Sequence, residues 1–87
     1  MQLWKLFKAL GSETRLKILQ ELLEKPQCQI NLQKCIKRDI STISRHIREL
    51  EEVGLVRVER IGKETQVLIK NKKMLKKLLE VGKCLMK

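Results

Sequence analysis

Aromatic side chains are nearly absent from this sequence. Trp4 and Phe7 are the only two in 87 residues, and there is no tyrosine. Modules that bind single-stranded nucleic acid or RNA loops stack unpaired bases on exposed aromatic rings. The shortage of rings therefore argues against that class of protein.

Reactive side chains are also scarce. There is one histidine, and no Cys-His pair, Ser-His-Asp set or glycine-rich phosphate loop is evident, so we predict that the chain is not an enzyme and has no small-molecule substrate. Cys28, Cys35 and Cys84 are an odd number at spacings that match no common zinc pattern. We expect them to be small buried hydrophobic residues rather than a disulfide framework.

Long apolar runs are missing as well. No run approaches the roughly 18 residues of a membrane span. Lys5 and Lys8 interrupt the apolar stretch at the amino terminus before it could act as a signal peptide. We therefore expect a cytoplasmic protein without a membrane partner.

Positive charge, in contrast, is abundant. The sequence has 20 lysines and arginines against 10 acidic residues, which gives a formal net charge of +10. Such an excess favours a polyanionic partner, and without aromatic stacking platforms double-stranded DNA is the leading candidate. The length predicts a single domain over residues 1–87, small enough that self-association would help to stabilise it.

The segment from Asp39 to Gly54 has the pattern of one amphipathic helix. Its apolar residues recur every three or four positions, which is the period of a helix that buries one stripe; they are Ile40, Ile43, Ile47 and Leu50. Ser41, Arg45 and Arg48 lie on the opposite side, with Thr42 and Ser44 beside them. Asp39 is placed to cap the helix and Gly54 to end it. The face with hydroxyls and arginines needs a partner.

The rest of the chain predicts three helices before this one, and two strands and a helix after it. The earlier helices are expected over residues 3–10, from Ser12 to before Pro26, and over 30–36. Alternating residues over 56–59 and 65–70, joined by a turn at Ile61–Glu64, predict a β-hairpin. Asn71 is placed to cap a final helix whose apolar residues exceed one stripe. The fold class is mostly α with a small β-hairpin (α+β), in the order α-α-α-α-β-β-α.

Three motifs in this order resemble the ArsR family of small dimeric repressors. Ala9 to Leu19 (ALGSETRLKIL) is similar to the family's opening segment, and Ser41 to Val56 (STISRHIRELEEVGLV) to its recognition helix and following strand. The hairpin matches the family's wing. The resemblance implies a winged helix-turn-helix domain with terminal dimerisation helices. It also implies a homodimer that represses transcription from an inverted repeat in DNA.

The resemblance also implies which residues contact DNA. Ser41, Thr42, Ser44 and Arg45 fall on the family's groove-facing positions, and His46 also matches its pattern. Because His46 lies beside the apolar stripe, packing or phosphate contact is favoured over base reading for it. Short hydroxyls and backbone amides can reach phosphate and base edges, and arginines such as Arg45 and Arg48 can bind guanine through two hydrogen bonds. Arg60 and Lys63 on the wing are expected to contact adjacent phosphates.

The terminal helices are expected to form the dimer interface, because a chain of this size has more apolar helix surface than its own core can cover. The expected contributors are Leu3, Trp4, Phe7, Leu75, Leu78, Leu79 and Met86. Cys84, in the last helix near the expected two-fold axis, could form a redox-active disulfide with its symmetry mate.

Metal sensing is not predicted. Family members that sense soft metals carry a Cys-x-Cys pair before the turn, and here Ile30 follows Cys28 at the second position. Members that sense zinc in the last helix use Asp and His, and this last helix has neither. A bound metal needs three or four convergent ligands, so we predict no metal and no cofactor.

Two other functions use the same charge. A chromosome-coating protein would bind DNA without regard to sequence, although it would gain nothing from a shaped recognition helix. A membrane-surface or protein-interaction module is suggested by the basic, apolar segment from Lys70 to Lys87.

Overall fold

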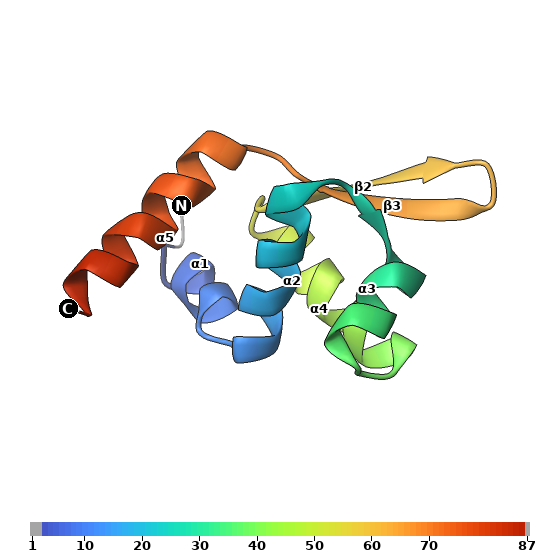
Figure 1. Ribbon diagram of the computed structural model, residues 1–87, viewed down its shortest axis with the longest axis horizontal. Coiled ribbons are helices and arrows are strands. Elements are labelled where there is room, and N and C mark those ends of the chain that lie inside the picture. Colours follow the sequence, from blue (N-terminus) through green and yellow to red (C-terminus); the bar gives the residue numbers. More distant parts are fainter. Residues whose placement is uncertain (1–2, 87) are drawn as a thin grey trace.

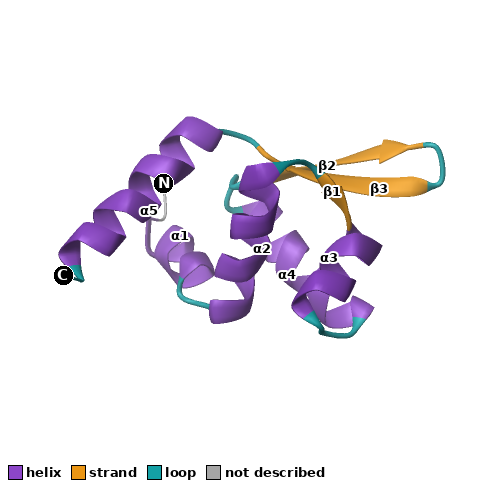
Figure 2. Ribbon diagram, in the orientation of Figure 1, coloured by secondary structure: helices purple, strands orange, loops and turns teal. Residues whose placement is uncertain are grey.

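A computed structural model describes residues 3–86, which form five helices and three strands (Figures 1 and 2). The elements are α1 (Leu3–Leu10), α2 (Glu13–Glu24), β1 (Gln27–Cys28), α3 (Gln29–Ile36), α4 (Ile40–Glu52), β2 (Val56–Ile61), β3 (Glu64–Ile69) and α5 (Lys72–Leu85). The hairpin of β2 and β3 projects from one end of the long axis and α5 lies at the other, with α1 to α4 between them (Figure 1). The predicted winged helix-turn-helix fold is confirmed.

The core forms where α2, α3 and α4 meet the base of the sheet. Its largest fully buried side chains are Ile18, Leu19, Leu22, Leu32, Ile43, Ile47, Leu50, Val56 and Val67. Their helical and strand spacing is the reason that these segments fold as they do, since each element buries one apolar stripe. Ile40 departs from the predicted stripe. It is 45% exposed at the first residue of α4, beyond the reach of the core.

Local sequence signals set the helix ends. The Ser12 hydroxyl accepts a hydrogen bond from the Arg15 backbone N–H at 3.3 Å, and Asn71 caps α5 in the same way through the Met74 N–H at 3.1 Å. After α4, Gly54 adopts a left-handed conformation with φ +81°, as predicted. The Leu55 N–H then bonds to the Leu50 carbonyl and the Gly54 N–H to the Glu51 carbonyl, which is a Schellman motif.

The three strands form one antiparallel sheet in the order β1-β3-β2. The strand β1 was not predicted, because two residues after a proline are too few to show alternation. It pairs with β3 through Gln27 opposite Val67. Gln27 is buried, and its amide donates to the Glu21 carbonyl and accepts from the Asn31 side chain, both at 2.9 Å. These bonds satisfy a polar group that would otherwise be costly to bury.

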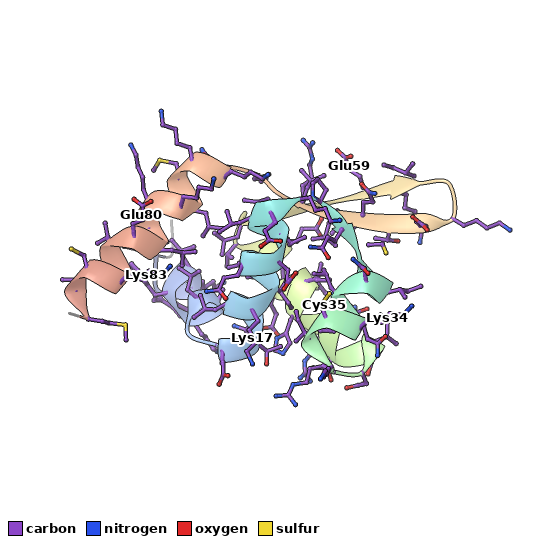
Figure 3. All side chains as sticks on the ribbon, in the orientation of Figure 1. Lys17, Lys34, Cys35, Glu59, Glu80 and Lys83 are labelled. Carbon is purple, nitrogen blue, oxygen red and sulfur yellow. The ribbon has the colours of Figure 1, made fainter. Side chains whose placement is uncertain are left out.

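The expectation that the cysteines are buried is wrong for two of them. Cys35 and Cys84 are exposed, and Cys28 is half-buried. Cys35 lies on α3, far along the molecule from Lys83, the neighbour of Cys84 on α5 (Figure 3). Cys35 follows the helical period of α3, but Leu32 occupies the side of that helix that faces the core.

Lys37, in the turn between α3 and α4, is the one non-glycine residue of 3–86 with a positive φ, at +61°. A left-handed residue with a Cβ atom is strained, and glycine relieves that strain at some cost in chain entropy. We therefore expect Lys37→Gly to raise the free energy of unfolding by about 0.5 to 1 kcal/mol in urea denaturation.

Lys34→Gly provides the matched control, because Lys34 is an exposed lysine inside α3. Glycine in a helix interior should lower the free energy of unfolding by about 1 kcal/mol. If both changes destabilise the protein equally, strain at Lys37 does not limit its stability.

Candidate nucleic-acid interface

The solvent-facing side of α4 presents the residues predicted for it. Ser41, Arg45 and Arg48 are exposed, while Thr42 and Ser44 are half-buried. The opposite side of the helix is held in the core by Ile43, Ile47 and Leu50. Burial of one side therefore fixes which side of α4 faces outward.

Asp39 holds the two hydroxyls at the start of α4. Its carboxylate accepts hydrogen bonds from Ser41 Oγ and from Thr42 Oγ1, the latter at 2.6 Å. These bonds, that from Ser41 above all, hold the pKa of Asp39 below its usual value. The prediction that Asp39 caps α4 is right in position only, because its side chain accepts no cap hydrogen bond from the helix backbone. Each hydroxyl has one proton to donate, so Ser41 and Thr42 are left as acceptors.

Ser44 has a structural contact instead of a free hydroxyl. Its Oγ donates to Oε1 of Gln29, the first residue of α3, at 2.9 Å. This bond joins the two helices of the helix-turn-helix pair. Ser44 therefore fixes the relative placement of α3 and α4, besides lying beside the exposed face.

Arg15 is a central residue of this region that the sequence analysis missed. Its Nε donates to Nδ1 of His46 at 3.1 Å, and its Nη1 donates to the carbonyls of Lys8 and Ala9 at 3.1 and 3.2 Å. Its Nη2 forms an ion pair with Glu49. One guanidinium on α2 thus joins the end of α1 to α4. No local pattern signals these contacts, since His46 lies 31 positions further along the chain.

His46 is half-buried and faces Arg15, not the exposed side of α4. Burial of the imidazole lowers the pKa of His46 from its ordinary 6.5, and the charge of Arg15 lowers it further. The neutral ring is also the form that can accept the Arg15 hydrogen bond. The interpretation of His46 as a packing residue is therefore favoured over base reading.

The wing carries its basic residues at its end. Arg60 and Lys63 are exposed, and Lys63 follows Gly62 in the two-residue turn, where Gly62 has φ +65°. Arg57, nearer the base, pairs with Glu59 at 2.8 Å. Arg60 and Lys63 take part in none of the ion pairs found within residues 3–86, so their charges are available to an anionic partner.

The terminal helices expose most of the apolar residues predicted for a dimer interface. Leu3, Trp4 and Phe7 are 54%, 61% and 55% exposed, and Met86 is 88% exposed. Leu78 and Leu79 are half-buried. Leu75 is a correction, because it is only 3% exposed and packs into the chain's own core. Three exposed residues of α5 were left out of the predicted set; they are Met74, Val81 and Leu85.

Two further searches concern residues 3–86. No group of three or more His, Cys, Asp or Glu side chains in that range lies close enough to hold a metal ion. Within the same range, no helix combines the length and apolar character that crossing a lipid bilayer demands.

Comparison with known proteins gives consistent matches. Residues 10–59 match the family model of a helix-turn-helix domain. The uncharacterized HTH-type transcriptional regulator YuzN of Bacillus subtilis is 40% identical over 82 residues, which cover 86% of this chain and 88% of YuzN. The cadmium resistance transcriptional regulatory protein CadC of Listeria innocua is 35% identical over 77 residues, or 87% of this chain. This chain spans 64% of the length of CadC.

A solved structure agrees over the whole fold. The homodimeric winged helix-turn-helix DNA-binding domain Mb0332 of Mycobacterium bovis, described as a possible ArsR-family transcriptional regulator, superposes with a TM-score of 0.84 at 26% identity. The match covers 92% of this chain and 76% of Mb0332. These relatives are transcriptional regulators, in agreement with the prediction that the chain is not an enzyme. The chain belongs to the ArsR family of winged helix-turn-helix transcriptional regulators.

Proposed function

We propose that two copies of this chain bind an inverted repeat in double-stranded DNA and repress transcription from it. The observation that carries the proposal is the exposed cationic face of α4, with Arg45 and Arg48 opposite a fully buried stripe. In a helix-turn-helix domain that face enters the major groove. A sequence-indifferent coating protein would need the charge of this face but not its defined shape.

Within each half-site, we assign different roles to α4 and the wing. Arg45 is exposed on the first half of α4 and offers a planar guanidinium that can bind guanine O6 and N7 together. Lys63 at the tip of the hairpin offers a single charge to a phosphate. Base contacts determine sequence preference, whereas phosphate contacts raise affinity for any duplex.

The hydroxyl pair at the start of α4 suggests a second base contact. Because Ser41 and Thr42 donate to Asp39, the group they form presents acceptors only. Cytosine N4 and adenine N6 are the amino donors of the major groove. We propose that this end of α4 selects one of these bases.

The proposed dimer forms through α1 and α5. A groove of approximately 370 Å³ lies between α1, α5 and the end of α4, and its lining includes Leu6, Met74 and Leu78. Apolar side chains of a second copy would fill it, and in such a dimer the two α4 helices should be about 34 to 36 Å apart, one turn of DNA. Cys84 is exposed on α5, and its disulfide with a second copy stays a prediction.

The cadmium resistance in the name of one relative concerns that relative. Metal binding by this chain would require three or four convergent ligand atoms. The groups of residues 3–86 supply no such set within one copy. The absence of a metal effector stays a prediction.

Sedimentation tests the dimer. At micromolar concentration we expect the wild-type chain to sediment at twice 10.3 kDa. Phe7→Glu should sediment as a monomer, because it places a charge on the proposed interface without disturbing the core. Ile30→Glu is the matched control, since Ile30 is equally exposed but lies on α3. A wild-type monomer would contradict the proposal.

Arg45→Ala and Lys63→Ala test the division of roles. Duplexes enriched from a random pool provide the cognate site, and scrambled versions provide the comparison. Arg45→Ala should cost roughly 1 to 3 kcal/mol per half-site on the cognate duplex and little on the scrambled one. Lys63→Ala should weaken both, and should reduce the slope of log affinity against log salt by about one. Equal losses on both duplexes for Arg45→Ala would favour the coating protein.

Asp39→Asn tests the acceptor group. The amide releases the two hydroxyls as donors, so preference for cytosine or adenine at one position of the half-site should fall by about 1 to 3 kcal/mol. The preference read by Arg45 should remain. Glu80→Gln on α5 controls for the loss of one negative charge. An unchanged base profile in Asp39→Asn would reject the assignment.

A further inference from the structure

The contact between Arg15 and His46 has no part in the proposed base or phosphate contacts, although His46 belongs to α4. It lies between α1, which we assign to the dimer, and the helix that we assign to DNA. The Arg15 side chain is 13% exposed and binds both helices at once. Loss of this contact would therefore alter how α4 is held against the rest of the domain.

The chemistry of the contact fixes the state of the histidine. An arginine has hydrogen-bond donors and no acceptor, so the Nδ1 atom that receives its Nε–H must carry a lone pair. His46 is then neutral, with its proton on Nε2. A second proton would go to Nδ1 and would point at the Arg15 N–H from 3.1 Å. Two donors and two positive charges would meet, and the hydrogen bond would be lost.

The surroundings of His46 oppose that second proton. Arg15 faces it from α2, Arg45 from α4 itself and Arg38 from the turn after α3, and each disfavours the imidazolium. Glu49 is the acidic neighbour that favours it, and that carboxylate is already paired with Arg15. Partial burial acts in the same direction as the arginines and is the largest cause of the lowered pKa of His46.

We propose that Arg15 and His46 form a proton-sensitive latch that holds α4 in its DNA-binding orientation and opens in mild acid. They are positioning residues, since Arg15 acts on DNA only through α4. This inference rests on the proposed function, and it adds a response to acid.

The sign of the acid response separates the latch from simpler roles. A histidine that faced phosphate would become positive on acidification and would tighten binding to every duplex. Opening of the latch instead weakens binding to the cognate duplex, because α4 loses a fixed orientation while the surface charge remains. Cognate affinity and affinity for random DNA should therefore change in different ways.

The latch also predicts how stability varies with pH. The folded His46 takes up its proton at a lower pH than the unfolded chain, whose histidine titrates near 6.5. The contribution to stability is complete above that pH and is lost as the pH falls toward the folded pKa. His46→Gln should lack this dependence, because glutamine does not titrate.

Binding measured across pH tests the proposal, with a cognate duplex enriched from a random pool and a scrambled duplex. Between about pH 7.5 and pH 5.5, we expect the wild-type protein to lose about tenfold in cognate affinity, and to lose none on scrambled DNA. His46→Gln retains an acceptor for Arg15, so it should bind like wild type at the higher pH and keep its affinity at the lower. Nitrogen-15 spectra of free wild-type protein should show the Nε2–H form.

Three results would overturn the latch. They are cognate affinity that rises or stays constant in acid, a parallel loss in His46→Gln, and spectra that show a proton on Nδ1 at the higher pH. Equal binding of the wild-type protein to cognate and scrambled duplexes at about pH 7.5 is a different failure. That result would reject the proposed function, and the acid response of DNA binding with it, whatever the spectra show.

Discussion

Burial of the apolar stripe on α4 is the constraint on which the exposed face of that helix depends. Ile43, Ile47 and Leu50 are at most 1% exposed. Full burial of such side chains stabilises the fold by about 1.5 to 3 kcal/mol each. Rotation of α4 by half a turn would forfeit that energy and would bring Arg45 and Arg48 into the core. The position of the arginines is therefore set by residues that have no contact with a partner.

Hydrophobic burial alone does not fix a helix along its own axis, because it is non-directional. Directional bonds add this restraint at two points. Ser44 connects α4 to α3 through Gln29, and Arg15 connects it to α2 and to the end of α1. The carbonyls that Arg15 binds are among those that a helix end leaves without partners, so the same guanidinium also caps α1. A single buried cation thus serves three helices.

The terminal helices show the opposite situation. Ala9 is the only described residue of α1 that is buried, and Leu75 the only one of α5. The remaining apolar side chains cover more surface than one domain of this size can enclose. Exposed apolar residues beside many lysines also explain why α5 resembles a membrane-surface helix in sequence. Membership of the ArsR family and a homodimeric neighbour of the same fold favour a second copy as the partner of this surface.

The sequence by itself determined the helices, the hairpin, their order and the outward face of α4. These features follow from local periodicity and from end signals such as Ser12, Gly54 and Asn71, which act within a few residues. Tertiary structure decided which polar groups meet. Neither the bond of Ser44 to Gln29 nor the contacts of Arg15 leaves a periodic trace, because their partners are distant in the chain. It also decided that Leu75 is buried and Cys35 exposed, since helical spacing defines a stripe but not the neighbour that covers it.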